Sequence, residues 1–134
     1  MSCFFIGSAA KTAGAAISDT ALGILLNANT GSNCGGTIAI VSNGTNLDSG
    51  TSCAFSAAGD LSGVDPQLGA LTTDNGGPTA THALSSSSPA IDAVGIGDCI
   101  DFTGSPLLVD QRGVTRPAGS QCDIGAYEFD PLAP

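Results

Sequence analysis

Turn-forming residues interrupt this chain so often that only short segments of regular structure fit between them. The 134 residues include 19 Gly and 7 Pro. Five X-Pro dipeptides recur in the second half at spacings of 11 to 17 residues: Asp65-Pro66, Gly77-Pro78, Ser88-Pro89, Ser105-Pro106 and Arg116-Pro117. Each proline also restricts the residue before it to an extended backbone. We therefore expect brief strands joined by turns rather than long helices.

The residue types also favour β-structure. Helices are rich in Glu and Lys, yet Lys11 is the only lysine and Glu128 the only glutamate. The other acids are all Asp, which favours turns and caps. Hydrophobic residues make up 42% of the chain, which is enough for a packed core, so intrinsic disorder is not expected.

The charge balance excludes two classes of partner. The formal net charge is −9, with 3 Lys and Arg in total. So few cations cannot neutralise a run of phosphates, which argues against nucleic acid and against an anionic membrane surface. No apolar stretch approaches the roughly 20 residues that span a bilayer, so we expect no membrane span.

Short apolar runs bounded by Gly, Asn and Ser characterise residues 1–56. They are Cys3–Ile6, Ala13–Ile17, Ala21–Leu26 and Thr37–Val41. Each has the length of a strand, and Gly14 and Gly23 weaken a helical alternative for Ala13–Leu26. The runs at Phe4 and Ile24 lie about 20 residues apart, near the length of one solenoid coil. Two runs do not establish a period, but they are compatible with residues 1–56 being coils of a β-solenoid.

Residues 57–129 change character and are predicted to form an irregular, loop-rich cap closed by a disulfide. The brief strands expected between its prolines are Ala90–Ala93, Leu107–Val109 and Ile124–Phe129. Residues 130–134 have the composition of a Pro-rich linker.

The cysteines predict two local disulfides. Cys34 and Cys53 flank one Gly/Asn-rich segment, Cys99 and Cys122 flank another, and no CxxC motif or second histidine suggests zinc. Pairing within each segment is simplest, and each bridge would contribute about 3 kcal/mol in the chain-entropy model. Cys3 is left as a buried thiol or as the partner of another cysteine. Disulfides favour a secreted or cell-surface location, although no signal peptide follows Met1.

Eight ordered blocks carry a resemblance to a known module. They are Gly59-Asp60-Leu61-Ser62, Asp65-Pro66-Gln67-Leu68-Gly69, Asp74-Asn75-Gly76-Gly77-Pro78-Thr79, Thr81-His82-Ala83-Leu84, Ser88-Pro89-Ala90-Ile91-Asp92-Ala93, Asp110-Gln111-Arg112-Gly113, Arg116-Pro117 and Cys122-Asp123-Ile124-Gly125-Ala126-Tyr127-Glu128. Their order resembles the choice-of-anchor type domain at the C-terminus of large bacterial secreted β-helix proteins of the pectate-lyase-like superfamily. The segments around Asn33-Cys34, Asn46-Leu47-Asp48 and Ser52-Cys53-Ala54-Phe55 are similar to the last coils before that cap.

The resemblance implies an all-β fold: the end coils of a right-handed parallel β-helix followed by the cap. It also implies a non-catalytic structural or adhesive role at the cell surface. A solenoid that ends at Cys3, Phe4, Phe5 and Ile6 would expose unpaired strand edges. We therefore expect this edge to stack on upstream coils or, head to tail, on another copy, which builds filaments when it does not close.

Six charged residues of the cap permit two interpretations: Asp92, Asp110, Arg112, Arg116, Asp123 and Glu128. Paired carboxylates hydrolyse glycosides, so a polysaccharide lyase, a glycoside hydrolase or a glycan-binding fragment is the alternative function. The favoured interpretation is structural, with Arg112 forking onto Asp92 or Asp123 inside the cap. Few acids lie in the coils, where such β-helix enzymes usually carry their sites, so we predict no catalytic residues.

Two further sites are weaker alternatives. His82 with a serine of Ser85–Ser88 and Asp92 would imitate a hydrolase triad, but no G-x-S-x-G motif accompanies them. Asp98 and Asp101 offer hard oxygen ligands for calcium, but the chain has no EF-hand loop. We therefore predict no cofactor, with calcium as the alternative.

Overall fold

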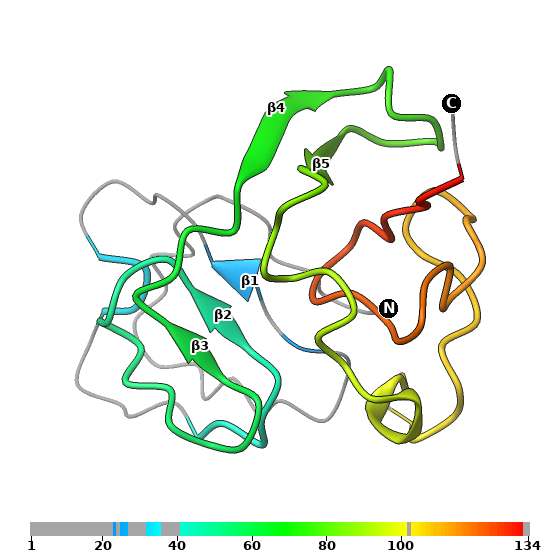
Figure 1. The fold of residues 1–134 in the computed structure, drawn as a ribbon. Coiled ribbons are helices and arrows are strands. Elements are labelled where there is room, and N and C mark those ends of the chain that lie inside the picture. Colours follow the sequence, from blue (N-terminus) through cyan, green and yellow to red (C-terminus); the bar gives the residue numbers. More distant parts are fainter. Residues whose placement is uncertain (1–22, 24, 27–31, 36–40, 102, 133–134) are drawn as a thin grey trace.

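The computed structural model describes residues 23, 25–26, 32–35, 41–101 and 103–132. Regular structure within these residues is brief (Figure 1). It consists of β1 (Leu25–Leu26), β2 (Leu47–Asp48), β3 (Leu61–Ser62), β4 (Leu68–Thr72), β5 (Thr81–Leu84) and the 3-10 helix η1 (Ile96–Asp98). The rest of the described chain is turns and extended loops.

The strands form two small sheets. Strands β1, β2 and β3 are parallel, in the order β1-β2-β3, and strands β4 and β5 form an antiparallel hairpin. The parallel register places Leu25 beside Leu47 and Leu47 beside Leu61, so one leucine from each strand stacks on the next. Figure 1 shows the three arrows side by side, with the hairpin rising from the end of the sheet.

One hydrophobic core joins the sheet to the C-terminal loops. It contains Leu25, Leu47, Leu84, Ala90, Val94, Cys99, Cys122 and Ile124. The approach between the two parts is close, because a Cβ added to Gly125 would lie 3.4 Å from Cβ of Leu25. The parallel sheet thus shares its core with residues 84–124, which come after it in the sequence.

The right-handed parallel β-helix expected from the sequence is wrong. The described residues form two small sheets of short strands and contain no closed solenoid coil. The regular parallel pairing is confined to two residues per strand, and the chain then reverses direction in the β4–β5 hairpin. Head-to-tail stacking of solenoid ends therefore loses its structural basis. Its expected edge, Cys3–Ile6, lies outside the described residues, as does Ala13–Ile17.

The three strands expected in the cap are also corrected. Ala90–Ala93 lies mostly in turns, and Leu107–Val109 contributes only the isolated bridge between Val109 and Thr115. Ile124–Phe129 bends instead of extending, because Gly125 has a φ of 102°. Side chains rather than a neighbouring strand take up several main-chain groups of this last segment.

The expected boundary near residue 56 does not separate the secondary structure. Strand β3 lies after this boundary, yet Leu61 pairs with Leu47 of β2. The main-chain N–H of Leu61 also donates to the carbonyl of Asn46 at 2.7 Å. The parallel sheet therefore includes residues from both sides of position 56.

Both predicted disulfides are present. Cys34 bonds to Cys53 and Cys99 to Cys122, with Cα–Cα separations of 4.9 and 6.1 Å. The first bridge ties residues 32–35 to the loop after β2, and the second joins the end of η1 to the Val94–Cys122 bridge. Cys3 lies outside the described residues. In the part of the chain that the structure describes, no helix is long and apolar enough to cross a membrane.

Candidate functional site

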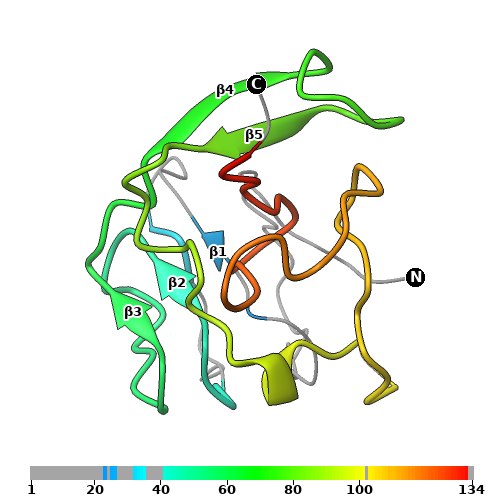
Figure 2. The ribbon, with the colours of Figure 1, turned by 45° about the vertical axis from the view of Figure 1, so that its right-hand side comes forward.

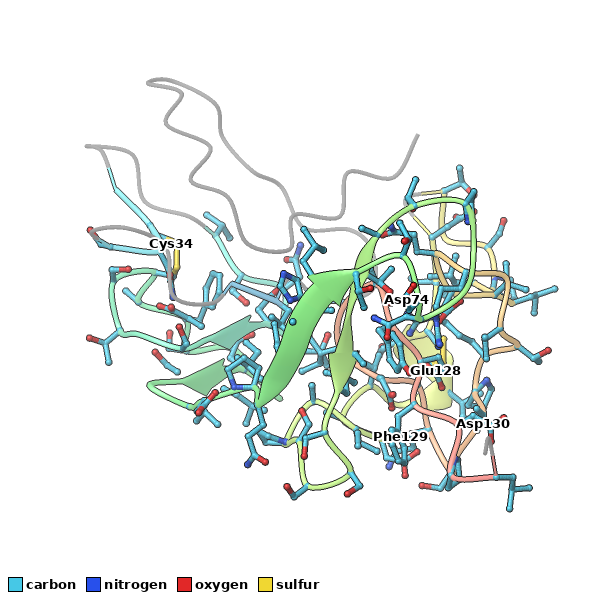
Figure 3. All side chains as sticks on the ribbon, turned by 90° about the horizontal axis from the view of Figure 1, so that it is seen from above. Cys34, Asp74, Glu128, Phe129 and Asp130 are labelled. Carbon is cyan, nitrogen blue, oxygen red and sulfur yellow. A yellow bond between two sulfur atoms is a disulfide. The ribbon has the colours of Figure 1, made fainter. Side chains whose placement is uncertain are left out.

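The densest group of charged side chains lies inside the C-terminal loops. We call it the ionic cluster, and it consists of Asp110, Arg112, Arg116, Asp123 and Glu128. All five residues come from one segment, residues 110–128, which folds back on itself without strands. Figure 3 shows Glu128 among the C-terminal loops, next to Phe129.

Arg116 is the centre of the cluster. Its Nη1 donates to Glu128 Oε2 at 2.8 Å and to the carbonyl of Asp123 at 2.9 Å, and its Nη2 donates to the carbonyl of Gly125 at 2.6 Å. Burial lowers the pKa of Arg116, whereas the charge of Glu128 opposes the shift. The guanidinium therefore holds the bent 123–125 segment in place from inside.

Glu128 uses both carboxylate oxygens. Oε1 accepts the main-chain N–H of Ala118 at 2.9 Å, and Oε2 accepts that of Asp123 at 3.1 Å as well as the Arg116 guanidinium. The Glu128 side chain is completely buried. A buried carboxylate that accepts this many donors fixes the loops around it.

Asp110 and Arg112 form the second ion pair. Asp110 Oδ2 lies 2.7 Å from Arg112 Nη2 and also accepts the main-chain N–H of Glu128 at 3.0 Å. Asp110 Oδ1 accepts the N–H groups of Arg112 and Val114. The Arg112 guanidinium lies 3.5 Å from the centre of the Tyr127 ring, which adds a cation–π contact.

The ion pairs differ from those expected, because Arg112 binds Asp110 and neither Asp92 nor Asp123. The turn at residues 110–113 brings Arg112 back onto the side chain two residues earlier. Asp123 instead accepts the main-chain N–H groups of Asp92 and Phe129, at 2.8 and 2.6 Å. Asp92 accepts the N–H of Gln121 at 2.7 Å. Asp92 and Asp123 are thus joined by a main-chain N–H bond, and among the described residues Arg112 donates to neither of them.

Asp123 has the most perturbed carboxyl group of the cluster. Burial raises its pKa to about 6, although the N–H bonds from Phe129 and Asp92 oppose the shift and the charge of Glu128 adds to it. The residue is 1% exposed. A carboxyl with such a pKa resembles a general acid, but here solvent and substrate do not reach it.

The arrangement organises loops better than it performs chemistry. Each carboxylate of the cluster accepts main-chain N–H groups, and all four of its buried members, Asp110, Arg116, Asp123 and Glu128, are at most 7% exposed. Glycoside hydrolysis needs a pair of carboxyl groups on either side of an accessible bond. The Nε of Arg116 is the one buried side-chain polar atom of the described residues with no hydrogen-bond partner.

His82 and the serines considered for a hydrolase triad bind other groups. His82 Nδ1 lies 2.7 Å from the carbonyl of Gly69 within the hairpin. Ser88 donates its hydroxyl hydrogen to the carbonyl of Pro66, and Ser87 to the side-chain oxygen of Gln67. These contacts give each group a structural partner, and in the described residues none of them joins a serine hydroxyl to His82.

The acids considered for calcium are used locally or lie at the surface. Asp101 Oδ1 accepts the N–H and hydroxyl of Thr103 and the N–H of Ser105. The hydrogen bonds from Thr103 lower the pKa of Asp101. Asp98 is exposed in η1. Among the described residues, no group of three or more His, Cys, Asp or Glu side chains is arranged to hold a metal ion.

A second polar cluster, beside the parallel sheet, was missed in the sequence. Asp60 Oδ1 accepts the main-chain N–H of Asn46 at 2.9 Å, and Oδ2 accepts the Ser42 hydroxyl and the Ala57 N–H. Burial would raise the pKa of Asp60, but these bonds outweigh it and lower the pKa. The signal was available, because Asn46 and Asp60 each directly precede the leucine of a strand.

Asp48 braces the other end of β2. Its side chain is fully buried, and it accepts the Asn33 side-chain N–H at 2.5 Å, the Gly50 N–H at 2.9 Å and the Cys53 N–H at 3.1 Å. It thereby connects the two sides of the Cys34–Cys53 disulfide. No lysine or arginine occurs between residues 41 and 65. Within the described residues, Asp48 and Asp60 accept N–H groups and, for Asp60, the Ser42 hydroxyl.

No family model, curated protein or solved structure matches this chain. The resemblance to the choice-of-anchor module therefore stays a prediction, and the function has to be argued from the geometry above.

Proposed function

We propose that this chain is a non-catalytic structural or adhesive module of a secreted or cell-surface protein. The observation that carries the proposal is that the buried carboxylates accept hydrogen bonds from the main chain. Those of Asp110, Asp123 and Glu128 hold main-chain N–H groups in loops that have almost no strands. Acids committed in this way supply rigidity to a loop-rich body and leave no accessible acid–base pair within the cluster.

The two disulfides support the extracellular part of the proposal. Disulfides persist in oxidising compartments and are rare where thiols are kept reduced. Each bridge here closes a loop of a chain with little regular structure, and such cross-links stabilise the fold by restricting the unfolded chain. A durable extracellular module would be built in this way.

A turnover assay separates this proposal from the carbohydrate-active alternative. The purified chain is incubated with soluble pectins and a panel of glycans, with and without calcium, and new reducing ends and unsaturated products are measured. We expect no turnover above that of a heat-unfolded, reduced sample. The proposal would be contradicted if the chain showed turnover and if Asp123→Asn abolished it while the variant remained folded. In that case the carboxyl of Asp123, with its raised pKa, would be catalytic.

A further inference from the structure

Strand β4 lies at the rim of the molecule, and one of its edges has no strand partner among the described residues. Its sheet contains only β4 and β5 among the described residues. Figures 1 and 2 both show β5 between β4 and the C-terminal segments, so that the other edge of β4 faces outward. Residues 69–71 are exposed, and Leu71 is 61% exposed. An edge of this length is the longest in the described chain.

The register indicates which main-chain groups this edge presents. Main-chain groups along an antiparallel strand point alternately toward and away from the partner. Ser85 N–H donates to the carbonyl of Gln67, so these two residues face each other. Leu68, the next residue, therefore turns its N–H and C=O outward. Leu71 does the same, because it is opposite His82, which lies an odd number of residues from Ser85.

The sequence of β4 leaves this edge unprotected by charge. Natural edge strands commonly carry Lys, Pro or inward-pointing charges that prevent pairing with other chains. The segment Leu68-Gly69-Ala70-Leu71-Thr72 carries none of these. A bulge between Leu68 and Leu71 is its one irregularity. The nearest charged residues along the sequence are the exposed acids on either side, Asp65 and Asp74, and Figure 3 shows Asp74 in the turn that follows β4.

The charge of the surface selects the partner. Arg112 and Arg116 are the only Lys or Arg residues in the described part of the chain, and both are engaged in internal ion pairs. A second copy of this chain, with a net charge of −9, would bring like charges together at Asp65 and Asp74. A cationic segment would instead find an acid beyond each end of β4.

We infer that the outer edge of β4 binds an extended peptide segment of another protein, with an uncharged centre and basic residues at both ends. Main-chain hydrogen bonds to Leu68 and Leu71 supply the pairing, and Asp65 and Asp74 select the basic ends. This is strand addition to an exposed sheet edge. It deepens the adhesive role proposed above by naming a surface and a partner, and so it rests on that proposal.

The test uses a synthetic peptide whose Thr/Val core matches the five residues of β4 and whose ends carry lysines. Binding to the disulfide-bonded chain is measured by calorimetry and mapped by amide chemical shifts. A second peptide has the same charges but N-methylated main-chain nitrogens at alternate core positions. We expect N-methylation to weaken binding by about tenfold, because it removes the pairing edge of the peptide.

Variants of the protein test the charge selection. Asp65→Asn with Asp74→Asn should weaken binding of the lysine-ended peptide by about fivefold, since each exposed ion pair contributes modestly. Asp98→Asn makes the same type of substitution at an exposed acid in η1 and should leave binding unchanged. A peptide with glutamates in place of the lysines should bind more weakly than the lysine-ended one.

Two results with the peptides would overturn the inference: no binding of the lysine-ended peptide at millimolar concentration, or equal binding of the N-methylated peptide. Amide chemical-shift changes outside residues 65–85 would also overturn it. So would pairing of β4 with a second copy in sedimentation experiments. These failures can be told apart from failure of the proposed function. Glycan turnover would contradict the non-catalytic role whatever the peptide does, whereas loss of peptide binding leaves the turnover result unaffected.

Discussion

The parallel sheet and the C-terminal loops both bury carboxylates, but they satisfy them with different donors. Around the sheet, the buried Asp48 and the partly buried Asp60 accept N–H and hydroxyl groups of the described residues. In the ionic cluster, Glu128 and Asp110 add guanidinium groups to the main-chain donors. The sheet already organises its main chain by strand pairing, whereas the loops lack that support. Buried ion pairs thus occur where secondary structure is weakest.

The two regions should therefore respond differently to loss of a single side chain. Removing one member of a buried ion pair leaves an uncompensated charge in the interior, whereas removing a neutral or hydrogen-bonded group leaves only unsatisfied N–H donors. Because one core joins both regions, we expect them to unfold in one transition, from which the free energy of unfolding is measured. Hydrogen exchange then shows in which region a substitution acts.

The largest effect is expected for Arg116→Met. This substitution removes the partner of the fully buried Glu128 and the donors to two main-chain carbonyls. We expect the free energy of unfolding to fall by about 3–5 kcal/mol, measured in urea at pH 7.

The double variant Arg116→Met with Glu128→Gln controls for that effect. Because it removes both charges, it should be destabilised by less than the sum of the single variants. An Arg116→Met protein that loses under about 1 kcal/mol would show that the ionic cluster does not support the loops.

Removal of each disulfide is expected to have the next largest effect. The two loops have similar sequence separations, 19 and 23 residues, so chain entropy predicts a similar loss of about 3 kcal/mol for each. Cys99 and Cys122, however, belong to the hydrophobic core, whereas Cys34 does not. We expect the Cys99→Ser, Cys122→Ser pair to unfold at a lower temperature than the Cys34→Ser, Cys53→Ser pair in calorimetry. The reverse order would mean that the Cys34–Cys53 bridge contributes more to stability than the bridge in the hydrophobic core.

A smaller effect is expected for Asp60→Ala beside the parallel sheet. The substitution leaves the Asn46 and Ala57 N–H groups without their acceptor and should cost about 1–3 kcal/mol. Asp74→Ala is the matched control, because Asp74 is exposed, and it should change stability by less than about 0.5 kcal/mol. If Asp60→Ala and Asp74→Ala lowered the free energy of unfolding in urea equally, the hydrogen bonds of Asp60 would not stabilise the sheet.

These contrasts show how far the sequence could predict the molecule. Cysteine spacing was enough for the disulfides, because each pair flanks one local segment. The partner of Arg112 was not predictable, since Asp92, Asp110 and Asp123 carry the same side chain and the sequence does not show which of them folds back onto Arg112. The choice depends on the turn at residues 110–113, which returns Arg112 to Asp110.

The fold was harder to predict for a related reason. Apolar runs bounded by turn formers fit strands of many topologies, and the described chain pairs only a few residues at each point. Strand β4 was missed because Gly69 and Ala70 have low β-propensity. The Asn46-Leu47 and Asp60-Leu61 steps did carry a usable signal, in that a polar side chain precedes each paired leucine.

The remaining expected effects are those of pH, and they differ in sign between the regions. The pKa of Asp60 is lowered in the folded state from its ordinary value near 3.8. Asp60 therefore contributes stability that is present above pH 3.8 and is lost as pH falls through its folded pKa. In Asp60→Asn, unfolding free energies should fall less steeply on acidification below pH 4. An unchanged acid limb would contradict the role of its hydrogen bonds.

Asp123 has the opposite sign, because its pKa is raised to about 6 in the folded state by burial. Between about pH 4 and 6 the folded state binds a proton that the unfolded state does not. The stability from this proton is fully present below pH 3.8 and is lost as pH rises through 6. Asp123→Asn should therefore flatten the decline in unfolding free energy between pH 4 and 7, with carbon-detected NMR of the carboxyl as the direct measurement. A titration midpoint near pH 4 would mean that the N–H groups of Asp92 and Phe129 outweigh burial, as their counterparts do at Asp60.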